Sequence, residues 1–260
     1  MLVDSHCHLD FPKFAPQLDA VVARAGDAGV GVCVTIGTRL SGFERVHEIA
    51  ELFPNVYCSI GIHPHDAEKE PLKDESPLIE RAKLAKVVGI GETGLDYFYE
   101  HAPRQAQVAN FRAHIAAARE TKLPLIVHTR DADDDTIAVL REEMDRGAFT
   151  GVIHCFTGTR RLAEASLELG FYISVSGIAT FKKSDQLRAV LRDVPMERLL
   201  VETDAPFLAP MPLRGKTNEP SFVVHTAAAL AALKGVSAEE LAAATTDNFF
   251  RLFTRARRPA

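Results

Sequence analysis

Residues 2–8 read LVDSHCH, an apolar run that leads directly into two histidines separated by one residue. Alternate residues of a β-strand point to the same side, so a strand here would direct His6 and His8 the same way. Two imidazole groups placed in this manner can bind one cation between them. This stretch therefore predicts a strand whose end carries a pair of metal ligands.

Similar short runs, rich in valine and isoleucine, recur along the whole chain and predict eight strands. They cover residues 2–5, 30–36, 56–60, 87–90, 123–127, 151–153, 171–175 and 199–201. Amphipathic stretches typical of helices occupy residues 17–28, 42–52, 105–121, 133–145, 160–169, 185–193, 221–233 and 238–253. Strands that alternate with crossover helices indicate an all-parallel sheet, and eight such units predict an α/β fold of the (β/α)8 TIM-barrel class.

The composition is that of one ordinary globular domain spanning residues 1–260. Hydrophobic residues make up 47% and charged residues 25%, with no linker, no secretory leader and no apolar run long enough to cross a membrane. The four cysteines form no CxxC pair and are expected to be reduced. We therefore expect a cytoplasmic monomer with no membrane attachment and no obligatory protein partner.

The charge balance bears on possible substrates. Thirty basic and 35 acidic residues give a formal net charge of -5, which argues against indiscriminate binding to nucleic-acid backbones. A phosphodiester substrate is still compatible, because bound metal ions can supply positive charge. Residues 89–94, GIGETG, match a dinucleotide-binding pattern formally, but the next strand ends in His128 instead of the required acidic residue. Dinucleotide binding is therefore not expected.

Most of the predicted strands are followed by residues able to bind a metal ion. Six of the ten histidines lie at these positions, among them the pair His63 and His65. In a parallel barrel the carboxyl ends of the strands converge on one face, where these side chains would meet. The expected metal ligands are His6, His8, Glu92, His128, His154 and Asp204.

Six ligands are more than one tetrahedral zinc ion takes, and they suit two divalent ions that share a carboxylate and a water molecule. Imidazole with carboxylate is compatible with zinc, manganese or iron, whereas sites for magnesium alone usually contain less histidine. A phosphate group of a substrate could complete the shell of any of these ions. The expected cofactors are therefore two divalent ions, magnesium, manganese or zinc, whose identity the residues leave open.

Six motifs along the chain resemble, in order and spacing, those of the TatD-type metal-dependent deoxyribonucleases. They are DSHCHLD at 4–10, GIHPH at 61–65, GETGLDY at 91–97, HTRDA at 128–132, HCFTG at 154–158 and ETDAP at 202–206. The resemblance extends from residue 2 to about residue 253 and implies a distorted TIM barrel of the amidohydrolase type. It also implies cleavage of DNA, often by 3′–5′ exonucleases that prefer single strands.

The resemblance further implies roles for individual residues. The family pattern puts His6 and His8 on one ion, His128 and His154 on the other, Glu92 between them, and Asp204 as ligand and general base. Residues 214–220, RGKTNEP, resemble the family's RGKRNEP loop, so Arg214 and Lys216 are expected to contact the substrate. Thr217 stands where the family has arginine, which removes one phosphate contact.

The expected mechanism is hydrolysis by a water molecule that the two ions activate, with Asp204 accepting its proton. His63 could donate to a phosphate oxygen or to the leaving alkoxide, and His65 could do the same or hold its loop. Glu202 lies on the same side of its strand as Asp204. It is expected to assist catalysis by orienting a ligand, with a buried structural carboxylate as the alternative.

Cationic and aromatic side chains near the predicted strand ends could bind a nucleic acid, because aromatic rings stack on bases and cations contact phosphates. Each could instead be ordinary surface charge or packing. The candidates are Arg104, Arg130, Arg160, Lys182, Arg214 and Lys216 for phosphates, and Tyr97, Phe98, Phe156, Phe181 and Phe207 for bases.

Three functions are compatible with these residues. A two-metal phosphodiesterase that acts on DNA is the leading interpretation. A metal-dependent amide or ester hydrolase, acting on a small molecule or an aminoacyl-nucleotide, would use the same fold and ligands without a basic rim. A non-catalytic metal-binding protein would leave no open position on its ions and would show no turnover.

Overall fold

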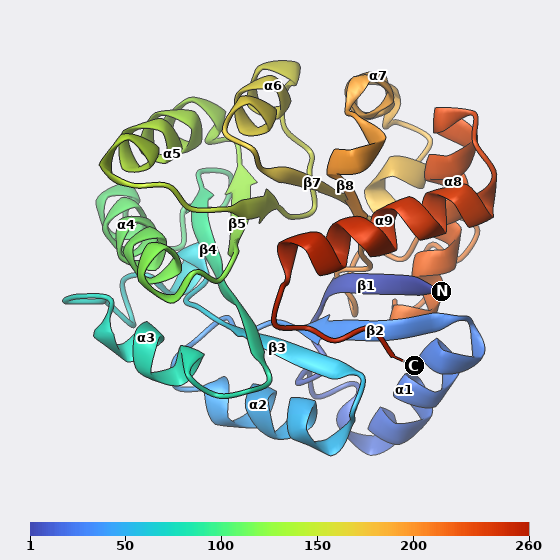
Figure 1. The fold of residues 1–260 in the computed structure, drawn as a ribbon, viewed down its shortest axis with the longest axis horizontal. Helices are drawn as coiled ribbons and strands as arrows, with labels where there is room; N and C mark the ends of the chain where they lie inside the picture. Colours follow the sequence, from blue (N-terminus) through green and yellow to red (C-terminus); the bar gives the residue numbers. More distant parts are fainter. Residues whose placement is uncertain (260) are drawn as a thin grey trace.

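Eight parallel strands in chain order form the centre of the computed structural model, which describes residues 1–259 (Figure 1). Each strand pairs in parallel with the next one along the chain. The strands are β1 (Leu2–Cys7), β2 (Val30–Thr35), β3 (Val56–Ile60), β4 (Val87–Asp96), β5 (Leu125–Arg130), β6 (Gly151–Ile153), β7 (Tyr172–Val175) and β8 (Leu199–Val201). The predicted (β/α)8 barrel is confirmed.

The barrel is nearly closed between its first and last strands. Cys7 forms a parallel bridge with Ala205, just beyond β8. The hydroxyl of Ser5 donates a hydrogen bond to the carbonyl oxygen of Val201 over 3.0 Å. The end of β1, which carries the first two histidines, is therefore held beside the end of β8.

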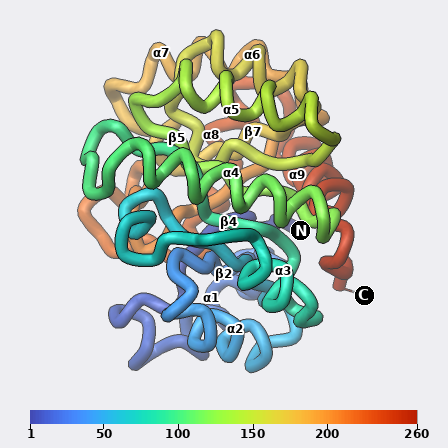
Figure 2. Tube along the Cα trace, turned by 90° about the vertical axis from the view of Figure 1, so that its left-hand side faces the viewer, coloured from blue at the N-terminus to red at the C-terminus, as the bar shows by residue number. Residues whose placement is uncertain are grey.

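Helices surround the sheet and cover one end of it (Figure 1). They are α1 (Leu18–Asp27), α2 (Phe43–Leu52), α3 (Ser76–Ala82), α4 (Arg104–Thr121), α5 (Asp133–Arg146), α6 (Arg160–Glu168), α7 (Asp185–Asp193), α8 (Val223–Lys234) and α9 (Ala238–Leu252). Phe249 and Phe253 at the end of the chain pack against inward-facing strand side chains such as Val32 and Val88. The α9 helix therefore closes the amino end of the barrel, on the same side as both termini (Figure 2).

Within residues 1–259, no single helix is both long and apolar enough to cross a membrane. Residues 220–234 and α9 meet these criteria of length and hydropathy only when they are counted as one segment, and the two helices meet at an angle of 108°.

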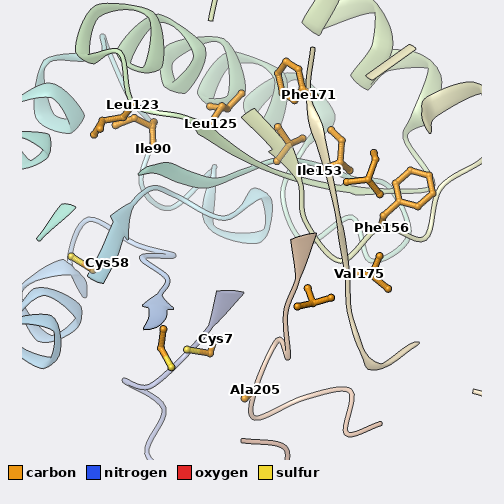
Figure 3. Close-up of a cluster of buried hydrophobic side chains, with 14 of the residues drawn as sticks. Cys7, Cys58, Ile90, Leu123, Leu125, Ile153, Phe156, Phe171, Val175 and Ala205 are labelled. Atoms are coloured by element: carbon orange, nitrogen blue, oxygen red, sulfur yellow. The ribbon is translucent and has the colours of Figure 1, made fainter. Parts of the chain in front are cut away.

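The larger part of the apolar core lies between the strands and the surrounding helices. Figure 3 shows part of it, with Ile90, Leu125 and Ile153 contributed by three consecutive strands. Three of the four cysteines are buried and all four thiols are free, as expected. Because this layer anchors the outer face of the strands, their carboxyl ends form a rigid base for functional side chains.

Strand β4 extends beyond its predicted end at residue 90 and continues to Asp96 beside β5. A Cβ atom at Gly94 would overlap with the carbonyl oxygen of His128 in β5. Only glycine tolerates this approach together with a φ of +139°. The extension places Glu92 inside the paired part of β4 rather than at its end.

Candidate metal centre

The carboxylate of Glu92 lies at the centre of the face formed by the carboxyl ends of the strands. It is buried, with 3% of its side chain exposed, and five imidazole rings approach it within 4.0 Å. These rings belong to His6, His8, His63, His128 and His154. Histidines from the ends of three strands and from the loop after β3 therefore meet at one carboxylate of β4.

The two oxygens of Glu92 face different histidines. Oε2 lies 3.4 Å from Nε2 of His6 and 4.0 Å from Nε2 of His8. Oε1 lies 3.0 Å from Nδ1 of His128 and 2.8 Å from Nε2 of His154. A carboxylate placed between two sets of nitrogen donors is suited to bridge two cations.

Asp204, which follows β8, lies beside the histidines of β1. Its Oδ1 is 3.2 Å from Nε2 of His8 and 3.6 Å from Nε2 of His6. Its side chain lines a cavity and is 14% exposed, more than that of Glu92. Asp204 can therefore contact both a cation at this position and a water molecule from the cavity.

Two buried carboxylates contact His128 and His154 at the ring nitrogens that do not face Glu92. Oδ2 of Asp96 lies 3.1 Å from Nε2 of His128, and Oε1 of Glu202 lies 3.2 Å from Nδ1 of His154. A neutral imidazole that donates to such a carboxylate presents a lone pair on its other nitrogen, which here faces Glu92. Glu202 is buried, does not line the cavity and contacts His154, a geometry that suits the expected role of orienting a ligand, which stays a prediction.

His63 differs from His128 and His154, because one of its ring nitrogens accepts a hydrogen bond from the protein backbone. Its Nδ1 accepts a hydrogen bond from the backbone N–H of His65 over 3.1 Å. The proton of the neutral ring is then on Nε2, which lies 3.4 Å from Glu92. Burial lowers the pKa of His63 to about 4, so the ring is neutral at physiological pH. His63 is therefore arranged as a hydrogen-bond donor to the cavity.

Unpaired ring nitrogens in the cluster test whether its residues fit a metal. Both ring nitrogens of His6 and Nδ1 of His8 are buried, with no hydrogen-bond partner among the described residues. Each such atom costs about 1–3 kcal/mol unless something compensates it. The nearest donor atoms of His6, His8 and Glu92 lie within 4.8 Å of one another, and a cation between them would satisfy Nε2 of His6. The residues fit a divalent ion.

A second group of donor atoms shares Glu92 with the first. It joins His63, Glu92 and His128 within 4.8 Å. A third group joins His6, His154 and Glu202. Because these groups overlap, the division of the ligands between two ions that the resemblance implies stays a prediction.

The charges of the cluster favour a cation. Burial opposes ionisation of Glu92, but the His154 and His63 rings hold its pKa well below the ordinary value. Burial likewise opposes protonation of His154, yet the carboxylates of Glu92 and Glu202 raise its pKa well above the ordinary value. The centre thus attracts positive charge, which protons or metal ions can supply.

The centre opens into a cavity of about 930 Å³ on the carboxyl face of the barrel. Arg39 and Lys69 line its wall, and both pair with Asp66, at 2.8 and 3.1 Å. A second cavity of about 1060 Å³ adjoins the first, and Arg130 lines both. The metal centre therefore has room for a substrate larger than a single phosphate.

Known proteins share the motifs and the fold of this chain. The sequence pattern of the family described as "TatD related DNase" matches residues 3–254. The chain belongs to this TatD family. It is 48% identical over 257 residues to the "Uncharacterized metal-dependent hydrolase YcfH" of Escherichia coli K12, covering 97% of this chain and 95% of that protein.

A TatD relative with a named activity is more distant. The chain is 36% identical to the "3'-5' ssDNA/RNA exonuclease TatD" of Citrobacter rodentium, with 97% of each chain covered. The crystal structure of YJJV, a TatD homologue from Escherichia coli, superposes with a TM-score of 0.90 at 32% identity over 97% of this chain and 98% of that one. The chain is thus a metal-dependent hydrolase with the TatD barrel.

The two cations of the loop that resembles the family's RGKRNEP segment point to solvent. Arg214 and Lys216 are exposed, and neither lines the two cavities. The guanidinium carbon of Arg214 instead lies 4.1 Å from the centre of the Phe181 ring. Asn218 is buried and donates to the carbonyl oxygen of Thr203 over 2.8 Å, which ties the loop to β8. Substrate contact by Arg214 and Lys216 stays a prediction.

The candidate stacking rings divide into buried and exposed ones. Phe156 is 2% exposed and belongs to the core, and Tyr97 is covered by Arg104 at 4.0 Å. Phe98 and Phe207 are 53% and 47% exposed. Only these two of the five rings present a largely open surface.

Asp96 was not among the site residues expected from the sequence. Its Oδ2 lies 2.9 Å from Nε2 of His65 as well as 3.1 Å from Nε2 of His128. Burial opposes its ionisation, but the hydrogen bonds from both rings lower its pKa. Asp96 is four residues beyond Glu92, so an alternation argument could have found it if the strand had been predicted to continue.

Proposed function

We propose that this chain hydrolyses phosphodiester bonds of DNA, as a 3′–5′ exonuclease that prefers single strands. The observation that carries the proposal is the Glu92 carboxylate between two sets of histidine nitrogens, at the base of an open cavity. The name of the Citrobacter rodentium relative supports the choice of substrate and polarity.

Divalent ions, when bound, supply Lewis-acid activation of the phosphate and of a water molecule. His6, His8 and Asp204 would hold one ion and His128 and His154 the other, with Glu92 shared. Burial opposes ionisation of Asp204, but its contact with His8 lowers the pKa of the carboxyl. Asp204 is therefore ionised and able to take a proton from the attacking water.

His63 contributes from the opposite side of Glu92. Its Nε2–H is directed to the centre because Nδ1 is engaged by the backbone of His65. A neutral donor of this kind stabilises negative charge on a phosphate oxygen and can protonate the leaving alkoxide. Water adds to phosphorus and passes one proton to Asp204. The P–O bond to the departing nucleoside oxygen breaks, and that oxygen takes up the Nε2 proton of His63, which the proton held by Asp204 replaces through solvent.

End-labelled single-stranded DNA tests this proposal directly. The protein is stripped with EDTA and supplied separately with magnesium, manganese or zinc, and cleavage is followed in time. Metal-restored shortening from the 3′ end is the expected result, abolished in His128→Ala and Asp204→Ala. Full activity of both variants would overturn the site assignment, and no cleavage with any metal at full occupancy would overturn the DNA substrate.

A second candidate is an amide or ester hydrolase acting on a small molecule. The pairing of Arg39 and Lys69 with Asp66 favours it, because one carboxylate offsets half of the positive charge that these two side chains would offer a polyanion. Parallel assays with aminoacyl-nucleotides and small esters separate the two functions. Turnover of an ester without any turnover of DNA would select this candidate.

A further inference from the structure

Arg130, the last residue of β5, lies where the two cavities meet. Within residues 1–259, no carboxylate oxygen comes within 4.0 Å of its guanidinium nitrogens. Most other cations that line these cavities are paired, which leaves Arg130 available to an incoming anion. The pairs are Arg39 and Lys69 with Asp66, Arg104 with Glu100, Arg160 with Asp193, and Arg161 with Asp134.

Two exposed aromatic rings lie against this guanidinium group. Its central carbon is 3.9 Å from the ring centre of Phe98 and 4.8 Å from that of Tyr99. The two rings are 53% and 50% exposed and contact each other edge to face. We call Phe98 and Tyr99 the aromatic platform. A guanidinium group that rests on a ring keeps its N–H edge free for a phosphate.

The platform belongs to a small set of large apolar side chains that are exposed to solvent. Of the seven large hydrophobic side chains that are exposed in the described chain, Tyr99 and Phe207 line the metal cavity. Phe98 and Met211 lie in the same two loops, which follow β4 and β8. Exposed apolar groups gathered around one opening mark a binding surface rather than chance exposure.

The platform is held in place by the protein itself. Backbone N–H groups of Phe98 and Tyr99 both donate to Oδ1 of Asp96 over 3.0 Å. Gln107 of α4 spans the same loop, since its Nε2 donates to the carbonyl oxygen of Ala102 over 2.9 Å and its Oε1 accepts from the N–H of Asp96. A surface fixed in advance loses little entropy when a ligand binds. Because Asp96 also holds a ring of the metal centre, the distance between platform and centre is constant.

We propose that Arg130 and the aromatic platform bind the nucleotide next to the one being removed from a single strand of DNA. The guanidinium edge contacts its phosphate, and its base stacks on the platform at Phe98, because the Tyr99 ring already stacks on His101 with ring centres 5.4 Å apart. This inference rests on the proposed function, whose cleaved phosphate lies at the metal centre. In a duplex both faces of the penultimate base are covered by neighbours, so the platform selects single strands.

Binding to oligothymidylates of about ten nucleotides tests the inference on the metal-loaded protein. Linkages at the 3′ end are phosphorothioates, which resist hydrolysis, and anisotropy of a 5′ fluorescein reports binding. One oligonucleotide is complete, one lacks the penultimate base, and one lacks a base near the 5′ end. Loss of the penultimate base should weaken binding to the wild type by on the order of tenfold, and loss of the distant base should not.

Variants assign the contacts to individual residues. In the double variant Phe98→Ala/Tyr99→Ala the penultimate base should no longer matter, whereas Tyr99→Phe keeps the ring and the preference. Arg130→Ala should reduce the slope of log K against log salt by about 0.7, the value for one phosphate contact in a single strand. Arg141→Ala removes the same charge from the outer surface of α5 and should leave the slope unchanged.

Two results would overturn the inference: an equal affinity of the wild type for all three oligonucleotides, or an unchanged salt slope in Arg130→Ala. Its failure is separable from that of the proposed function. Cleavage of DNA combined with unaltered binding in the variants rejects the platform and leaves the nuclease. The expected binding pattern without cleavage by the metal-loaded enzyme rejects the nuclease and leaves a single-strand binding site.

Discussion

At the scale of single residues, Asp96 connects the metal centre with the loop that follows β4. One of its oxygens faces the rings of His65 and His128, and the other accepts the backbone N–H groups of Phe98 and Tyr99. One buried carboxylate therefore sets both the direction of His128 and the path of the loop. Carboxylates that hold ligand histidines in this way typically change metal affinity or activity by 10–100-fold when they are replaced.

We predict that Asp96→Asn lowers the affinity for divalent metal by roughly 10–100-fold. The amide has the size of the carboxylate but not its charge, so His128 loses the partner that fixes its tautomer. Calorimetric titration with manganese measures the affinity, and circular dichroism checks the fold. Asp145→Asn, at the exposed end of α5, is the charge-matched control. Metal affinity equal to that of the wild type would contradict this role of Asp96.

His114 supports the segment that carries His63. Its Nε2 accepts the backbone N–H of Ile62 over 2.9 Å, and its Nδ1 lies 2.7 Å from the carbonyl oxygen of Asn110. Both contacts require a neutral ring with the proton on Nδ1. Burial lowers the pKa of His114 from 6.5 to about 4.

This pKa predicts a defined acid sensitivity of folding. Below pH 6.5 His114 is protonated in the unfolded chain, but in the folded chain it is protonated only below about pH 4. The free energy of unfolding therefore falls as the pH is lowered through this range. The contribution reaches roughly 3 kcal/mol and is absent above pH 7. In His114→Gln, whose amide oxygen can still accept from Ile62, this part of the pH dependence should vanish. Urea unfolding between about pH 4.5 and 7.5 measures it, and parallel curves for the two proteins would refute it.

The convergence of the candidate metal ligands could be predicted from the sequence, because each follows an apolar run and only the barrel is needed to bring them together. Of the two carboxylates that contact the other ring nitrogens of these ligands, Glu202 was expected to orient a ligand, whereas Asp96 was not among the expected residues. Whether Glu202 faces a substrate or His154 depends on the rotation of side chains 48 residues apart. Phe98 and Phe156 show the same limit, since both follow a strand but only one is exposed.

At the scale of elements, predicted boundaries fail where a strand depends on its neighbour. Glycines normally interrupt strands, which explains the predicted end of β4 at residue 90. Gly94 instead permits β4 to lie against the backbone of His128, and the ladder continues. That contact exists only once β5 is in place, so the segment 87–96 contains no local sign of it.

Helix α9 closes the amino end of the barrel with aromatic side chains. The rings of Phe249 and Phe253 are buried and stack with centroids 4.7 Å apart. The neighbouring Phe250 is only half-buried and lies beside the guanidinium group of Arg258. Removal of the Phe249 ring should therefore reduce the free energy of unfolding more than removal of the adjacent Phe250 ring.

We predict that Phe249→Ala lowers the free energy of unfolding by about 3–5 kcal/mol, because it leaves a cavity in a packed layer. Phe250→Ala is the matched control and should cost clearly less. Urea unfolding of the metal-loaded proteins gives both values. Phe249 lies at the opposite end of the barrel from Glu92, so metal content per folded chain should be the same in both variants. Equal losses of stability would contradict the closing role of α9.

At the scale of the whole molecule, the candidate metal centre spans the seam between the first and last strands of the barrel. The ladder runs from β1 to β8, and the seam has one isolated bridge, Cys7 to Ala205, with backbone hydrogen bonds from the N–H of Asp204 to the carbonyl oxygen of His6 and from the N–H of His8 to that of Ala205. The candidate ligands on either side of this seam are His6 and His8 from β1 and Asp204 from the end of β8. An ion bound to these three residues would join β1 to β8 directly.

Removal of metal should therefore lower the unfolding temperature of the whole barrel. An ion at about a hundredfold excess over its Kd adds roughly 2.7 kcal/mol, which corresponds to about 5–10 °C for a chain of this size. Thermal unfolding is compared before and after EDTA, with metal analysis expected to give two ions per chain before treatment. Asp204→Asn removes the ligand beyond β8 and should lose most of this difference, whereas Asp145→Asn should retain it. If the wild type unfolds at the same temperature with and without bound metal, the ions do not stabilise the seam, and the hydrogen bonds between β1 and the end of β8 close the barrel together with its packed core.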